Sequence, residues 1–341
     1  MQKSTLVALA IALTSRLSLA DNSDTLPTLN YPTQGQQLYA TAAAEKDLLT
    51  ITAQPWFKVT GEAWQLEGPA FDRQGNLLFV EVLGGQVLKV DTQGQLQVAV
   101  AKKTRVVLRA SPYTRTGACL SPGWGITSIQ AILRSTMPTV KKPEVIIDAN
   151  KGFLVDDLVF DAHGGFYFTD LKGTSTEPTG GVYYVPADHK SIVPILPNMA
   201  NANGIALSPD GKRLWVTEFG TGLLHRVELK DAQSIAPFGA VVVYRFHGPS
   251  PDSMRVDADG NVYVAQYSQG RVLVLNPNGL PIGQILLPGR EAGHFLFSTS
   301  MALKPGTREV YLVANDGDRG QGSMIFRARG FAQALPLFSH Q

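Results

Sequence analysis

The sequence VDADGNVYVAQYSQGRVLVLNPNG, residues 256–279, contains runs of alternating residues separated by short polar turns. Alternation of apolar and polar residues predicts strands, and Asp-Gly between two such runs is typical of a β-hairpin. The glycine supplies the positive φ that the turn requires. This stretch therefore predicts antiparallel hairpins that follow one another along the chain.

Related phrases recur four more times. They are FDRQGNLLFVEVLGGQVLKVD (71–91), FDAHGGFYFTDLKG (160–173), LSPDGKRLWVTEFGTGLLHRVEL (207–229) and LKPGTREVYLVAND (303–316). The turn glycines Gly75, Gly164, Gly211, Gly260 and Gly306 are spaced 89, 47, 49 and 46 residues apart. A period in the forties with about four strands per unit is typical of a β-propeller blade. Because the first interval is close to two periods, we expect an all-β, six-bladed β-propeller whose second blade is hidden.

The hidden blade falls on KKTRVVLRASPYTRTGACLSPGWGITS, residues 102–128, which lack the alternating pattern. If each codon here began one base earlier, permitted codon choices would give a strand, an Asp-Gly turn and an Asn-Thr-Gly turn. We therefore interpret residues 101–140 as an out-of-frame blade two, a hypothesis that resequencing of the gene tests. A nucleic-acid patch is disfavoured because the basic residues lack interleaved aromatic residues. Cys119 has no His or Asp constellation near it in the sequence.

Composition and the N-terminus bound the class of protein. The net charge of +2 gives no reason to expect a polyanionic partner, and a single cysteine excludes an internal disulfide framework. Residues 1–20, MQKSTLVALAIALTSRLSLA, have the layout of a signal peptide, so we expect a periplasmic or secreted protein without a membrane anchor after cleavage. The alternative is a disordered or anchoring tail, because Arg16 interrupts the region. We expect residues 21–48 to form an N-terminal extension with a short helix at 39–48, and residues 49–341 to form the propeller.

Four blades carry an oxygen-bearing side chain eight residues before the turn glycine, namely Glu67, Asp156, Asn203 and Asp252. Equivalent positions at the starts of innermost strands converge on the axis of a propeller, where three carboxylates would repel one another without a cation. Calcium accepts six to eight oxygen ligands. The sequence has no histidine pair at ligand spacing, which argues against zinc. The alternative is that these are turn and cap residues, as Asp and Asn often are. We predict an axial site for Ca²⁺ or another divalent cation.

Several long phrases, among them LEGPAFDRQGNLLFVEV, ANGIALSPDGKRLWVTE and GPSPDSMRVDADGNVYVAQYSQGRVLVLN, resemble the senescence-marker protein, gluconolactonase and luciferin-regenerating enzyme family. The resemblance implies a six-bladed propeller with a divalent cation on its axis. It also implies that Asp252 is the catalytic proton donor. The staphylococcal lactonases of this family imply a second, structural calcium. The implied axial ligands are Glu67, Asp156, Asn203, Asp252 and Ser253, and the implied second site contains Asp148, Lys151 and Phe153.

The leading hypothesis is therefore a calcium-dependent lactonase that hydrolyses a small-molecule lactone, with a metal-polarised carbonyl and Asp252 as proton shuttle. Two alternatives stay open: a non-catalytic propeller that binds a ligand, and a family member inactivated by the out-of-frame blade. No nucleophile elbow supports acyl-enzyme chemistry. We interpret His294 as a hydrogen-bonded buried or rim residue, and Asp157 as a turn or supporting group.

Overall fold

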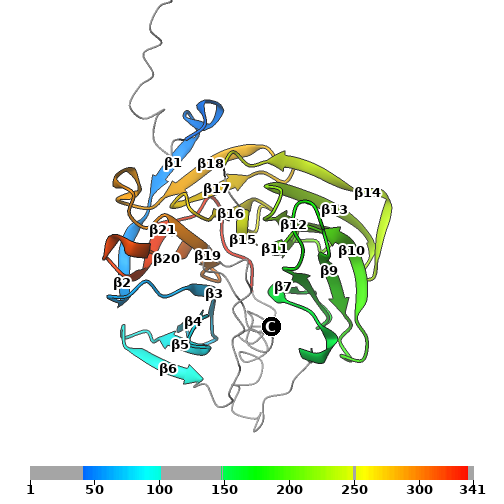
Figure 1. The fold of residues 1–341 in the computed structure, drawn as a ribbon, viewed down its shortest axis with the longest axis horizontal. Helices are drawn as coiled ribbons and strands as arrows, with labels where there is room; N and C mark the ends of the chain where they lie inside the picture. Colours follow the sequence, from blue (N-terminus) through cyan, green and yellow to red (C-terminus); the bar gives the residue numbers. More distant parts are fainter. Residues whose placement is uncertain (1–40, 101–146, 148, 249–250, 337–341) are drawn as a thin grey trace, which may run out of the picture. The chain divides into compact units, whose positions relative to one another are not determined.

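The computed structural model describes residues 41–100, 147, 149–248 and 251–336, all of which belong to one unit, Thr41–Gln341. Their strands form five sheets, each the blade of a β-propeller (Figure 1). The first blade contains β3 (Leu66–Phe71), β4 (Leu77–Glu81), β5 (Gln86–Val90) and β6 (Leu96–Val100). The second observed blade, which is distinct from the out-of-frame blade two expected at residues 101–140, contains β7 (Val155–Phe160), β8 (Phe166–Asp170), β9 (Gly180–Val185) and β10 (Val193–Met199). The third contains β11 (Ala202–Leu207), β12 (Arg213–Glu218), β13 (Leu223–Asp231) and β14 (Ser234–Arg245).

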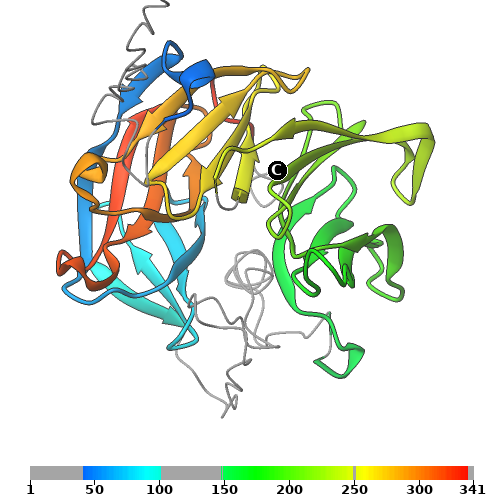
Figure 2. The same cartoon turned by 45° about the horizontal axis from the view of Figure 1, so that its top comes forward.

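Two blades near the C-terminus each take up one strand from the N-terminal side of the chain. The β15–β18 blade, with β15 (Pro251–Val256), β16 (Val262–Gln266), β17 (Arg271–Leu275) and β18 (Pro281–Leu286), gains β1 (Leu49–Thr52), which is parallel to β18. The β19–β21 blade, with β19 (Phe297–Leu303), β20 (Glu309–Asn315) and β21 (Ser323–Arg329), gains β2 (Gln54–Thr60), antiparallel to β21. Figure 2 shows β1 and β2 in blue along the outer side of these blades. β1 and β2 therefore pair with strands of the last two blades, β18 and β21 respectively.

The prediction of six blades is wrong, because the described residues form five. Each of the five marker glycines lies in one observed blade. The sixth blade was inferred only from the long interval between Gly75 and Gly164, and the sequence as written has no alternating strand pattern there. Residues 101–140, with the out-of-frame hypothesis and Cys119, lie outside the described residues.

The N-terminal predictions have mixed outcomes. The signal peptide 1–20 and most of the extension 21–48 lie outside the described residues, so export stays a prediction. The helix expected at 39–48 is reduced to one 3₁₀ turn, η2 (Ala43–Glu45). Among the described residues, no helix has the length and apolar character needed to cross a membrane. The other short 3₁₀ helices are η3 (Ala149–Lys151), η4 (Arg290–Ala292) and η5 (Gly317–Arg319).

The predicted hairpin turns are confirmed. The five marker glycines have φ values of +83°, +90°, +68°, +82° and +72° in chain order. In residues 256–279, Asp257 Oδ1 accepts hydrogen bonds from the backbone N–H groups of Asp259 and Asn261, at 3.1 and 2.9 Å. Asp72 and Asp161 hold their turns in the same way. In these three phrases the aspartate and the glycine therefore act together, one satisfying turn donors and the other supplying left-handed backbone.

Apolar clusters between adjacent blades form the core. Trp215 and Leu224 of the third blade pack with Met254 and Val264 of the β15–β18 blade, and all four are at most 1 % exposed. Similar clusters join the second blade to the third, the β15–β18 blade to the β19–β21 blade, and that blade to the first. Strand alternation therefore buries both faces of most blades. The innermost strands contact one another in the order β3, β19, β15, β11 and β7.

Candidate metal centre and active site

The four in-phase side chains occupy one structural position. Glu67, Asp156, Asn203 and Asp252 are each the second residue of an innermost strand, β3, β7, β11 and β15 respectively. Each is buried, with between 5 and 6 % of its surface exposed. The structure thus confirms their equivalence in the blades, because the sequence period carries the same residue to the same end of each blade.

A backbone irregularity at this position was not predicted. In β3, β7, β11 and β15 the pairing register with the neighbouring strand shifts immediately around the site residue, for example between Ala202 and Ile205. The fifth innermost strand, β19, has a shift between Ser298 and Ser300. A β-bulge inserts an unpaired residue and re-aims the side chains beside it. All five innermost strands therefore depart from regular pairing where the site lies.

The buried oxygens at the site lack hydrogen-bond partners. Within the described residues, this holds for Glu67 Oε2, Asp156 Oδ2, Asn203 Oδ1 and Ser253 Oγ. Asp252 Oδ1 accepts a hydrogen bond from the backbone N–H of Ser253 at 2.9 Å. Buried polar atoms are almost always satisfied, so several unsatisfied acceptors at one level of the propeller indicate a missing partner.

Electrostatics at the site disfavour ionised carboxylates in the protein alone. Burial raises the pKa of Glu67 well above its usual range, and the charges of Asp252 and Asp156 raise it further. Burial, then Asp252 and Asp157, have the same effect on the pKa of Asp156. Burial raises the pKa of Asp252 to about 8, although the Ser253 N–H and the Asn203 amide oppose the rise. A bound cation would reverse this balance by stabilising the charged forms.

The residues fit a hard divalent cation by their chemistry. All five side chains present oxygen, which calcium and magnesium prefer and which gives no advantage to zinc or copper. In the described part of the chain, no three His, Cys, Asp or Glu side chains lie close enough together to hold a metal by themselves. Any such centre therefore depends on the neutral oxygens of Asn203 and Ser253 as well as on the carboxylates.

Two threonines that the sequence analysis missed tie the site residues to the neighbouring blades. Thr169 in β8 donates to the backbone oxygen of Asn203 in the next blade, at 2.5 Å. Thr217 in β12 donates to the backbone oxygen of Asp252, again one blade further on, at 2.9 Å. Their sequence signal is the threonine-acidic pair that ends both strands, in FYFTD and RLWVTE. These hydroxyls fix the backbone of two candidate ligands.

Gly204 in β11 allows β11 and β15, the strands that carry Asn203 and Asp252, to approach closely. A Cβ at this position would lie 2.5 Å from the Asp252 backbone oxygen and 2.8 Å from the Met254 nitrogen. We expect Gly204→Ala to destabilise the protein by about 1–3 kcal/mol, because the clash is with backbone that cannot rotate away. Urea denaturation measures this effect. Gly61→Ala is the matched control, because a Cβ there meets no atom within 4 Å; equal stability of both variants would contradict the expectation.

An aromatic wall borders the site and was also missed. Tyr267 directly follows β16 and is largely buried, and its ring centroid lies 6.2 Å from that of Phe219 and 5.2 Å from that of Phe297. Burial, with the charges of Asp252 and Glu67, raises the pKa of Tyr267 to about 12. The Tyr267 hydroxyl therefore stays protonated near the carboxylates. The rings of Phe219 and Phe297 provide an apolar surface beside it.

The remaining predicted residues lie elsewhere. His294 Nδ1 is 3.0 Å from Asp316 Oδ1, which confirms the interpretation of His294 as a hydrogen-bonded residue. Of the predicted second metal site, Asp148 lies outside the described residues. Lys151 ends η3, and the ring of Phe153 packs on Phe168 and Tyr183. The second calcium site stays a prediction.

Comparison with known proteins shows to which family the chain belongs. Residues 66–304 match the family described as the SMP-30/Gluconolactonase/LRE-like region. The chain belongs to this family. Lactonase drp35 of Staphylococcus haemolyticus is 42% identical over 324 residues, which cover 94% of this chain and 99% of that protein. Lactonase drp35 of Staphylococcus aureus is 43% identical over 321 residues, or 93% and 98%.

The fold agrees with that of a solved structure. A luciferin-regenerating enzyme aligns with a TM-score of 0.60 at 18% identity, over 84% of this chain and all of that chain. The predicted resemblance to the SMP-30/gluconolactonase family and to its staphylococcal lactonases is therefore confirmed. The matched region spans all four in-phase residues.

Proposed function

We propose that this protein is a calcium-dependent lactonase. The observation that carries the proposal is the ring of buried oxygen donors at the second residue of four innermost strands, several of them without hydrogen-bond partners. Membership of a family that contains gluconolactonases, and relatives named lactonase, support lactones as the substrate class. The oxygen-only donor set supports calcium, or another hard divalent cation, as the cofactor.

Each residue has a distinct role in the proposed reaction. Glu67, Asp156, Asn203, Asp252 and Ser253 would hold the cation through their side-chain oxygens. A divalent cation bound there supplies Lewis acidity, which polarises the lactone carbonyl and acidifies water. Asp252 accepts a proton from the attacking water and returns it to the departing ring oxygen. Tyr267, Phe219 and Phe297 offer apolar surface to the rest of the lactone.

Hydrolysis of a panel of aromatic and aliphatic lactones, with and without a chelator, tests the proposal. We expect turnover to vanish on chelation and to return with Ca²⁺. The melting temperature gives a second readout, because a cation that binds only the folded protein stabilises it. Since the pKa values of Glu67, Asp156 and Asp252 are raised, protons compete with the cation at lower pH. Calcium should therefore raise the melting temperature more at pH 8 than at pH 6.

The possible outcomes separate the alternatives. Turnover that survives chelation would contradict the role of the cation. A calcium-dependent rise in melting temperature together with lactone binding, but without turnover, would favour the non-catalytic propeller.

A further inference from the structure

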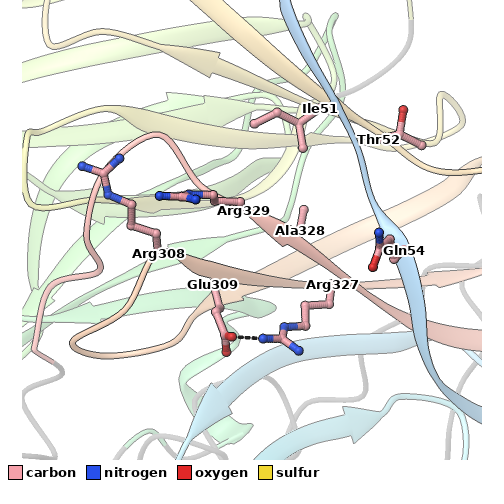
Figure 3. Close-up of a pocket in the computed structure, with 8 residues that line it drawn as sticks. All are labelled: Ile51, Thr52, Gln54, Arg308, Glu309, Arg327, Ala328 and Arg329. Atoms are coloured by element: carbon pink, nitrogen blue, oxygen red, sulfur yellow. Dashed lines mark hydrogen bonds and ion pairs between the residues drawn. The ribbon is translucent and has the colours of Figure 1, made fainter.

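A basic cavity lies where β1 and β2 meet the β19–β21 blade. It has a volume of about 630 Å³. Figure 3 shows its lining side chains, which come from β1, β2, β20, β21 and the turn before β20. They are Ile51, Thr52, Gln54, Arg308, Glu309, Arg327, Ala328 and Arg329.

This cavity is separate from the candidate metal centre. Glu309 begins β20 and Arg329 ends β21, whereas the metal-site end of this blade is marked by Asn315 at the end of β20 and by Phe297 at the start of β19. A strand of seven residues such as β20 spans about 20 Å. The two sites therefore lie at opposite ends of a blade.

The charges in the cavity are not balanced. Its single acidic side chain, Glu309, is ion-paired with Arg327 and also accepts a hydrogen bond from Tyr311. Lys304 Nζ, outside the cavity, lies 3.5 Å from the same carboxylate. Among the described residues, the guanidinium groups of Arg308 and Arg329 have no ion-pair or hydrogen-bond partner.

Backbone geometry keeps these two arginines near each other. The backbone N–H of Gly330 donates to the backbone oxygen of Arg308 at 2.6 Å, which fixes the residue after Arg329 against Arg308. In Figure 3 the Arg329 guanidinium extends toward that of Arg308. Two adjacent cations without a counter-ion repel each other, and guanidinium groups bind planar or tetrahedral oxyanions through paired hydrogen bonds.

We propose that this cavity binds a small phosphate monoester. Its three arginines and one glutamate carry a net charge of +2, which a dianionic phosphate balances and a single carboxylate does not. The volume exceeds that of a phosphate ion and leaves room for an organic body. Ile51 and the buried Ala328 provide apolar contact for that body, and the Gln54 amide can donate a further hydrogen bond.

Titration of the full-length protein with phenyl phosphate, followed by calorimetry and by melting temperature, tests the proposal. We expect saturable binding by the wild type, and binding about tenfold weaker for each guanidinium removed in Arg308→Gln, Arg329→Gln and the double variant. Inorganic phosphate should bind the same site more weakly, because it lacks the apolar body. Lactone hydrolysis should be unchanged in these variants, so this proposal can fail independently of the proposed function.

The control is a double variant that removes the same charge elsewhere, Lys190→Gln/Lys212→Gln, since both lysines are exposed and outside the cavity. It should bind phenyl phosphate as the wild type does. Arg329→Lys keeps the charge without the planar fork and should also bind more weakly. Equal affinity of the wild type and the Arg308→Gln/Arg329→Gln variant, or a melting temperature that rises equally with chloride at the same ionic strength, would overturn the proposal.

Discussion

Asp252→Asn is expected to lower kcat/KM for lactone hydrolysis by about 10²–10⁴-fold, the range that a positioned general acid or base contributes. Asparagine has nearly the same shape, so the fold should persist, but it cannot carry the proton between water and ring oxygen. It also replaces a charged candidate ligand with a neutral one, so calcium should bind more weakly. Steady-state kinetics at saturating calcium separate the loss of proton transfer from the loss of metal.

The same variant has a distinct stability signature in the presence of a chelator. The pKa of folded Asp252 is about 8, above its unfolded value, so its contribution to stability is complete at low pH and is lost as the pH rises through about 8. Asparagine does not ionise. Without calcium, Asp252→Asn should therefore be more stable than the wild type at pH 8, with a smaller difference at pH 5, by urea denaturation.

Asp210→Asn is the matched control for both experiments, because Asp210 is an exposed turn carboxylate that hydrogen-bonds to Ser208 in the third blade. It should retain full activity. Wild-type turnover by Asp252→Asn would exclude Asp252 as the proton shuttle.

The sequence predicts the five observed blades and the common position of four site residues in them, since both depend on local, repeated signals. Each turn glycine marks a change of direction that only positive φ permits, and four of the five phrases repeat the spacing from that glycine back to Glu67, Asp156, Asn203 or Asp252. A repeat architecture stacks equivalent units, so an in-phase residue in sequence becomes an equivalent residue in space.

Features that depend on contacts between distant residues could not be predicted in this way. The pairing of Leu49 with Gly283, and of Gln54 with Arg327, joins strands more than 200 residues apart, and no local pattern specifies it. The prediction of six blades failed for a related reason. It rested on the spacing of the turn glycines alone, across a stretch without strand periodicity. The bulges of the innermost strands leave no mark in the alternation of residues, yet they shape the site.

A buried ion pair beside the site illustrates the same limit. Arg255 Nη1 in β15 lies 2.9 Å from Asp157 Oδ2 in β7, although β11 stands between these strands in the order of blades. Asp157 is fully buried and also accepts a hydrogen bond from the backbone N–H of Leu158. Its neighbour Asp156 and the nearby Asp252 are candidate ligands. The sequence marked Asp157 only as a turn or supporting group and did not single out Arg255.

Arg255→Met is therefore expected to destabilise the protein by about 3–5 kcal/mol, because it leaves the buried Asp157 carboxylate without its partner. The variant should also bind calcium more weakly, since the pair connects the strands that carry Asp156 and Asp252. Urea denaturation with and without calcium measures both effects. Arg226→Met is the matched control, because Arg226 pairs with the partly exposed Glu228 in the third blade and should cost less than about 1 kcal/mol.

A double-mutant cycle distinguishes a specific ion pair from lost packing. If the cost arises from an uncompensated carboxylate, Asp157→Asn should recover much of the stability in the Arg255→Met background, because the remaining amide carries no charge. If the arginine contributes only its aliphatic stem, the two substitutions should add independently. Additive costs, with calcium affinity unchanged in Arg255→Met, would mean that Asp157 and Arg255 do not position the candidate ligands through their ion pair.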